Sequence, residues 1–216
     1  MNTAIKFAAA AALSLGLAGT AQAGMVAIAS PDLAYTSSTT LMPITAPDFT
    51  NINSVTDGIV TVSFSSPMNV RTVPGGGWGS WSSPPNSESA TPRVAYSNGA
   101  TSMTFTFSEA LDMFGFEVEP NNFGVRSVTA EFFDGATSVG TITLGVDGNS
   151  GARLFAADAD GGDSFTSVVL TTASGSGGFA IANARYAVAE VPVPATLALF
   201  SAALAGLGFA RTRRTA

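Results

Sequence analysis

The sequence contains no cysteine and no histidine among its 216 residues. Without cysteine no disulfide bond can form, so the region between residues 24 and 190 must hold its fold by a single hydrophobic core. Without histidine the chain lacks the most common general base, the Ser-His and Cys-His nucleophile pairs and the imidazole ligands of zinc. Any catalysis would therefore depend on carboxylates.

Positive charge is also scarce. Lys6 is the sole lysine, and residues 24–190 hold five arginines against all fifteen acidic residues, a net charge of −10. Phosphate binding requires clustered lysine and arginine, so we expect no nucleic-acid partner.

The N-terminus has the three-part pattern of a secretory signal peptide. Lys6 precedes the apolar stretch 7–18, and small residues follow at Ala21 and Ala23, where signal peptidase would cleave. An uncleaved anchor helix is the alternative, but this stretch is short against the roughly 20 residues needed to span a bilayer. We interpret residues 1–23 as a signal peptide and predict export.

Alternating apolar and polar residues, rich in β-branched and aromatic types, run through most of the exported region. The predicted strands span residues 58–64, 102–107, 113–119, 127–133, 139–146, 152–157, 165–172 and 178–189. Turn signals separate them at Asn98-Gly99, Asp134-Gly135, Asp147-Gly148 and Gly161-Gly162. No stretch shows a convincing helical period. The spacing predicts an all-β fold, an antiparallel β-sandwich or jelly roll.

Prolines are distributed unevenly along this region. Residues 31–92 contain eight of the eleven prolines, and residues 121–190 contain none. Because proline cannot donate to a sheet ladder, the first half must be looser or lie at an edge. We expect the best-packed part of the core at 93–189.

The two tryptophans, Trp78 and Trp81, lie in the glycine-rich segment VPGGGWGSWSSPPNSES. Indole rings on an exposed loop can stack on sugar rings, and Glu119, Asn121 and Asn122 leave the end of a predicted strand to complete a polar glycan-binding site. The alternatives are that both rings fold inward over one end of the sandwich, and that Pro-Asn-Asn only terminates a strand.

Carboxylates are candidates for two further kinds of site. Glu117 and Glu119 project to the same face of a predicted strand, as the acid pair of a glycoside hydrolase requires, although any acidic surface shows this pattern. Asp158, Asp160 and Asp163 crowd a turn in AADADGGDSF that can supply oxygen ligands to calcium, although a solvated turn is the simpler explanation. We predict no catalytic residue and no cofactor other than this calcium ion.

The last 26 residues, VPVPATLALFSAALAGLGFARTRRTA, differ from the rest of the chain. The apolar run 195–210 gives about 24 Å of helix, and counting from Val191 gives about 30 Å, the thickness of a hydrocarbon core. Arg211, Arg213 and Arg214 resist translocation and leave the domain outside and the stub inside. A buried helix of the β-domain is the alternative, but it leaves the arginines unexplained. We predict a transmembrane helix at 195–210.

This tail resembles the PEP-CTERM sorting signal of Gram-negative bacteria in its Pro-x-Pro-Ala-Thr segment, its short helix ending in LAGLGFA and its terminal arginines. Val191, Pro192, Val193 and Pro194 match the recognition motif in a form similar to the VPLPA variant, because Val193 replaces the glutamate. The resemblance implies export through the inner membrane, recognition of the motif by an exosortase and delivery to the cell surface or beyond.

The middle of the chain resembles a β-sandwich domain that is frequent in PEP-CTERM proteins and similar in form to carbohydrate-binding jelly rolls. The stretches VTAEFFDGATSVGTITL and GFAIANARY carry this resemblance. In such domains the last strand often reads FGIDNVRY, and here Ala182 takes the place of its aspartate, before Asn183.

These features predict an exported, non-enzymatic surface or extracellular-matrix protein associated with exopolysaccharide or biofilm. A dedicated glycan-binding module is the alternative. A carboxylate-dependent glycoside hydrolase is a third hypothesis.

Overall fold

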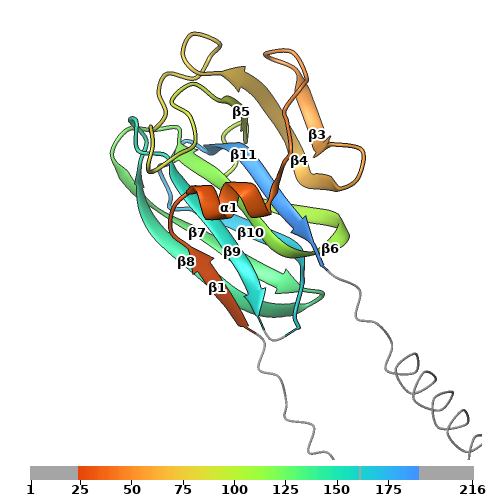
Figure 1. Ribbon diagram of the computed structural model, residues 1–216. Helices are drawn as coiled ribbons and strands as arrows, with labels where there is room; N and C mark the ends of the chain where they lie inside the picture. The colour runs from red at the N-terminus through yellow and green to blue at the C-terminus, as the bar shows by residue number, and fades with distance from the viewer. Residues whose placement is uncertain (1–23, 161, 190–216) are drawn as a thin grey trace, which may run out of the picture.

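The structure, a computed structural model, describes residues 24–160 and 162–189 (Figure 1). The predicted cleavage site at Ala21 and Ala23, the sorting motif 191–194, the helix 195–210 and the arginine cluster lie outside the described residues. The described part is an all-β domain of antiparallel strands with one short helix.

The elements follow one another along the chain as β1 (Gly24–Ile28), α1 (Leu33–Ser38), β2 (Thr40–Leu41), β3 (Asn51–Thr56), β4 (Thr61–Thr72), β5 (Arg93–Tyr96), β6 (Ser102–Pro120), β7 (Val125–Asp134), β8 (Thr137–Asp147), β9 (Arg153–Asp160), β10 (Phe165–Thr172) and β11 (Phe179–Val188).

The strands form two layers that share β4 and β6. One layer has the order β8-β7-β10-β6-β4-β3, and the other has the order β1-β9-β6-β11-β5-β4. The first half of β6 pairs with β4 and β10, and its second half pairs with β9 and β11. Because two long strands pass from one layer to the other, the layers pack as a sandwich that is joined along its length.

Strand β4 bends where it passes between the layers. Residues 62–64 pair with β6 and residues 69–71 pair with β5, whereas Pro67 falls in none of the described strand registers. The proline therefore lies where no ladder donor is required. Strand β4 can for this reason pair with neighbours on both sides. The proline content of residues 31–92 had instead predicted a looser segment or an edge strand.

The core between the layers consists mainly of phenylalanine. Ten of the twelve largest fully buried side chains come from residues 93–189, and seven of these are phenylalanines. Phe105 and Phe116, for example, pack with ring centroids 5.2 Å apart. Met42 and Met68 come from the proline-rich half, so that half also contributes to the core.

The first and last described strands reach the same end of the sandwich (Figure 1). Gly24 pairs with Asp160, and Val188 pairs with Leu111 near the middle of β6. Pro120 lies at the opposite end of β6, where the loops that follow β4, β6 and β8 gather. The first and last described strands therefore begin and end at the end of the sandwich opposite these loops.

The predicted strands agree well in the second half of the chain and less well in the first. The five strands predicted between 127 and 189 are confirmed as β7 to β11, with ends shifted by a few residues. The two strands predicted at 102–107 and 113–119 form the single strand β6, because Leu111 in the connecting segment is buried and paired. The pattern failed to predict β1, β2, β3 and β5.

The expectation of no helix is also wrong, because α1 is present. Asp32 caps this helix, and its carboxylate accepts a hydrogen bond from the Tyr35 amide at 3.0 Å. A helix of six residues is too short to show a hydrophobic period, so the capping residue was the available signal.

Candidate functional site

The second half of β6 is buried on both faces. Phe116 and Val118 point into the main core, whereas Glu117 and Glu119 point to the opposite face, as strand alternation predicted. Both carboxylates are fully buried, at 0% and 1% exposure. The loop between β4 and β5, residues 73–92, contacts both side chains through Ser80, Trp81 and Glu88 and buries them.

Glu117 accepts three hydrogen bonds, two from that loop and one from β11. Its Oε2 accepts from the indole Nε1 of Trp81 at 2.8 Å and from the side-chain amide of Asn183 at 3.2 Å, and its Oε1 accepts from the Glu88 backbone amide at 2.6 Å. Burial raises the pKa of Glu117 from 4.5 to about 7. The three hydrogen bonds lower the pKa, but their effect is smaller than that of burial. Glu117 is therefore an anchor for the loop.

Glu119 makes a second, weaker anchor. Its Oε1 accepts from the Ser80 hydroxyl at 3.0 Å, and Ser80 in turn accepts from the Ser150 amide at 3.0 Å. Its Oε2 accepts no hydrogen bond of normal geometry, although the Trp78 indole and nearby backbone amides lie close enough to favour the carboxylate. Burial is the larger effect and raises the pKa of Glu119 to about 7.

The buried carboxylates do not form an accessible glycosidase acid pair. Three of their four oxygens accept hydrogen bonds from protein donors, and both side chains are buried beneath the covering loop. The burial of both side chains does not provide the accessible acid pair that the hydrolase hypothesis expects, and that hypothesis stays a prediction.

The two tryptophans fold inward, as the alternative reading of the loop predicted. Trp78 is 5% exposed and Trp81 is 4% exposed. They pack in a small apolar cluster on the outer sheet face with Val73, Val94, two alanines of β11 and the alanine that precedes β9. The expectation of an exposed indole platform is wrong, because neither ring has a face available for a sugar.

A small hollow of about 60 Å³ nevertheless brings three of the five predicted glycan-binding residues together. Trp78, Glu119 and Asn121 all line it, beside the exposed ring of Phe123. Asn122 turns away, and its side-chain amide donates to the Gly175 carbonyl at 2.9 Å. The hollow has room for water molecules or one hydroxymethyl group and is too small for a sugar ring.

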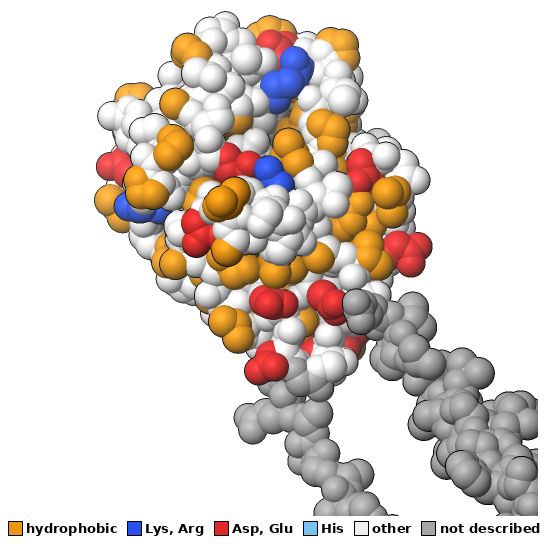
Figure 2. All heavy atoms as spheres, in the orientation of Figure 1, with side chains coloured by type: hydrophobic (Ala, Val, Ile, Leu, Met, Phe, Trp, Pro, Cys, Tyr) orange, Lys and Arg blue, Asp and Glu red, His pale blue; other side chains and the backbone are white. Residues whose placement is uncertain are grey.

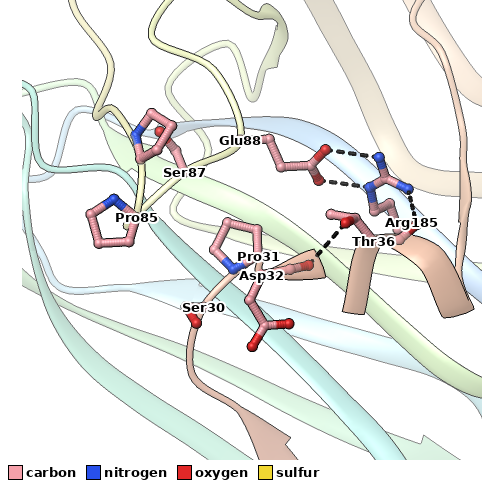
Figure 3. Close-up of a pocket in the computed structure, with 9 residues that line it drawn as sticks. Ser30, Pro31, Asp32, Thr36, Pro85, Ser87, Glu88 and Arg185 are labelled. Atoms are coloured by element: carbon pink, nitrogen blue, oxygen red, sulfur yellow. Dashed lines mark hydrogen bonds and ion pairs between the residues drawn. The ribbon is translucent and has the colours of Figure 1, made fainter. Parts of the chain in front are cut away.

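A larger hollow of about 440 Å³ opens beside the covering loop (Figure 3). One side is formed by the segment that leads into α1, and the other by the end of the covering loop. It is lined by Ser30, Pro31, Asp32, Thr36, Pro84, Pro85, Ser87, Glu88 and Arg185.

Arg185 and Glu88 form the fixed polar wall of this hollow. The guanidinium donates to both Glu88 carboxylate oxygens, from Nε at 2.7 Å and from Nη2 at 2.8 Å. Its Nη1 donates to the carbonyl oxygens of Thr36 and Thr39, at 3.2 Å each, at the end of α1. Both side chains are mostly buried, so the pair is rigid and joins β11, the covering loop and the helix.

The hollow combines groups that recognise polyols. Carboxylates of Asp32 and Glu88 retain unused lone pairs, and three hydroxyl side chains stand at its rim. Proline rings supply apolar C–H surface between these polar groups (Figure 3). Its volume lies within the range of small-molecule sites and exceeds that of the 60 Å³ hollow beside Trp78.

Few sequence signals point to this site. Arg185 was visible only as a charged residue within the apolar strand that ends the domain. Its partner Glu88 lies 97 positions earlier, so no local spacing connects the two. Asp32 carried the signature of a helix cap, which is a structural role in itself.

The predicted calcium site is not formed by the described residues. Asp163 accepts a hydrogen bond from the Gly24 amide at 2.8 Å, and Asp158 and Asp160 lie on β9 opposite β1. Among residues 24–160 and 162–189, no three carboxylates come together as metal ligands. Burial, then the charges of Asp112 and Asp160, raise the pKa of Asp158. Figure 2 shows acidic side chains at this end of the domain.

Comparisons with known proteins give no family assignment. No protein-family model and no curated protein matches the chain. In the part of the chain that the structure describes, no helix is long and apolar enough to cross a membrane.

Two solved structures overlap with the chain at low similarity. The C-terminal family 22 carbohydrate-binding module of Clostridium thermocellum Xyn10B is 12% identical, with a TM-score of 0.34 over 70% of this chain and 100% of that one. The enzymatically active domain of bacteriophage CBA120 tailspike protein 4 is 19% identical, with a TM-score of 0.32 over 61% of this chain. The chain spans 19% of the tailspike's length. Overlaps this loose carry no argument about fold or ligand.

Proposed function

We propose that the chain is an exported, non-enzymatic surface or matrix protein that an exosortase-type system sorts, and that its β-sandwich binds extracellular polysaccharide. The signal-peptide pattern, the PEP-CTERM-like tail and the acidic, lysine-free region between them support the sorting. The burial of the Glu117–Glu119 pair supports a role without catalysis.

The arrangement of the domain suits this role. A membrane tail that follows Ala189 would hold the sandwich by one end, and the loops beyond Pro120 would then face away from the membrane. In this orientation the large hollow lies on the flank of the sandwich, beside α1, where a polymer outside the cell can reach it.

The observation that carries the binding proposal is the hollow itself. Polysaccharide recognition needs directional hydrogen bonds from rigid polar groups next to apolar surface. The Arg185–Glu88 pair supplies rigid polar groups, and the prolines at 31, 84 and 85 supply the apolar surface. Asp32 adds a carboxylate that is fixed by its capping role.

Affinity electrophoresis in gels that contain the native exopolysaccharide tests the binding proposal. We expect the polysaccharide to retard the protein, and Asp32→Asn, which keeps the helix cap, to weaken retardation about 5-fold or more by removing one charged acceptor. Ser30→Trp, which fills the hollow, should abolish it. Glu109→Gln, an equal charge change at an exposed position outside the hollow, is the control. Unretarded wild-type protein, or retardation that neither hollow variant changes, would contradict the proposal.

The sorting proposal has a separate test. Replacing Arg211, Arg213 and Arg214 by serine should misorient the tail and prevent processing, because the positive charges set its topology. The intact mass of the protein recovered from the cell surface reports both cleavage points. Unchanged processing of the serine variant would contradict this part of the proposal.

A further inference from the structure

Strand β8 forms the outer edge of one layer of the sandwich. It is eleven residues long and pairs with β7, and no other described strand is hydrogen-bonded to it. Its residues 141, 143, 144 and 145 are exposed. A row of backbone amides and carbonyls therefore faces outward along this part of the strand.

This edge lacks the features that normally prevent pairing between proteins. Natural edge strands carry lysine, proline, an inward-pointing charge or a covering segment. From residue 137 to residue 146, TSVGTITLGV, β8 contains no charged residue and no proline. Met25 of β1 packs against β8 at Gly140, where an added Cβ would meet its side chain. The half from Thr141 to Val146 is open.

We propose that this open half of β8 pairs with β8 of a second copy of the chain, antiparallel, about a two-fold axis that passes beside Thr143. Each copy then extends the sheet of the other, and the two layers that contain β7 and β8 become one continuous sheet.

The charges favour a second copy in this orientation. Asp147 is the one charged residue of β8, and an antiparallel pair centred on Thr143 separates the two Asp147 carboxylates by eight residues, about 26 Å. That distance exceeds the screening length of about 8–10 Å at ordinary ionic strength. A parallel pair in register would place the same carboxylates next to each other.

The side chains fit the same axis. On β8, Leu144 is 37% exposed, whereas Ile142, two residues earlier on the same face, is buried. Centring the pair on Thr143 places Leu144 of each copy opposite Ile142 of the other, so the pairing covers this exposed leucine. The Thr143 hydroxyl already forms a hydrogen bond with the hydroxyl of Thr129 on β7, at 2.9 Å. Thr143 of the second copy would extend this row of threonines across the new interface.

The absence of cysteine makes the pairing directly testable. In the full chain, solubilised in detergent, Thr143→Cys introduces the one thiol of the molecule. Facing residues on a two-fold axis have Cα atoms about 4.5–5.5 Å apart, so oxidation should give a disulfide-linked dimer at least ~5-fold more efficiently than at a control position. The control is Val26→Cys, at an exposed position of the edge strand β1. Crosslinking of the Val26→Cys variant also measures any association of two copies through their C-terminal tails.

A charge exchange tests the axis independently of the disulfide. In a dimer of Thr143→Lys two lysines face each other at the axis, and in a dimer of Thr143→Glu two glutamates do. Each variant alone should therefore lose the association that analytical ultracentrifugation detects in wild type. An equal mixture should regain it, because lysine then faces glutamate. Wild-type association should strengthen with salt, which screens the negative charge of the domain. Equal crosslinking at Thr143 and Val26, or a mixture that associates no better than either variant alone, would overturn the proposal.

Discussion

Replacing Glu117 by glutamine tests the role of the buried carboxylate in holding the covering loop. The carboxylate accepts from three donors, the Trp81 indole, the Glu88 amide and the Asn183 side chain. Glutamine has the same shape but only one acceptor oxygen, so its amide group must face at least one of these donors. A buried donor without a partner costs about 1–3 kcal/mol.

The size of the effect depends on pH, because burial raises the pKa of Glu117 from 4.5 to about 7. The folded protein holds this proton more tightly than the unfolded chain does. The carboxyl therefore contributes stability that is fully present below pH 4.5 and is lost as the pH rises through 7, about 3 kcal/mol in all. Glutamine does not titrate, so the variant lacks this loss.

Urea unfolding, followed by the fluorescence of the two buried tryptophans, measures the difference. At pH 5 the side chain of Glu117 is protonated in the folded protein, but its hydroxyl oxygen can still accept a hydrogen bond, whereas the nitrogen of glutamine cannot. The variant should therefore be about 1–3 kcal/mol less stable than wild type at this pH. At pH 8 the gap should close or reverse, because wild type has lost the contribution of its proton. The other titrating groups occur in both proteins and cancel. A gap that is constant, or that widens at pH 8, would refute the reasoning, and the exposed Glu109→Gln should show no gap at either pH.

Three further predictions concern the contact between β6 and α1, the Arg185–Glu88 pair and the acidic turn. Gly115→Ala should cost about 2 kcal/mol or more and should displace α1, because the new Cβ would contact Ala156 and lie 2.5 Å from the Tyr35 hydroxyl; thermal melts and circular dichroism check this. Arg185→Lys should cost about 1.5–3 kcal/mol in urea unfolding, because lysine cannot make the two-pronged bond to Glu88, and an unchanged midpoint would contradict it. A calcium chelator should leave the Tm of the domain unchanged, because the acidic turn gathers no three carboxylates among the described residues.

The fold of the second half could be predicted from sequence because its signals are local. Strands β7 to β11 show two-residue alternation or β-branched runs between Asx-Gly and Gly-Gly turns, and each strand begins and ends near those signals. The first half lacked such signals. Strand β5 has only four residues, and β4 contains Pro67 at a bend whose effect depends on the neighbouring strands.

The candidate site was less predictable, because it depends on contacts between distant segments. Alternation correctly placed Glu117 and Glu119 on one face, but it could not indicate that a loop would cover that face. The tryptophans made the loop look like a ligand platform, whereas their burial is what fixes the loop. The Arg185–Glu88 pair joins residues 97 positions apart, and sequence spacing contains no information at that distance.

The two proposed surfaces lie on different layers of the sandwich, and this separates their consequences. The large hollow is built on the layer that contains β11, whereas β8 is the free edge of the other layer. A matrix protein can then bind polymer and pair with a second copy at the same time, and each dimer would present two binding sites to one polymer. The two surfaces share no residue. Thr143→Lys should therefore leave the retardation of each chain by a short polysaccharide fragment unchanged. Asp32→Asn should likewise leave the Thr143→Cys crosslink unchanged. With a long polymer, however, loss of the dimer should weaken retardation, because two linked sites raise the effective concentration of the second.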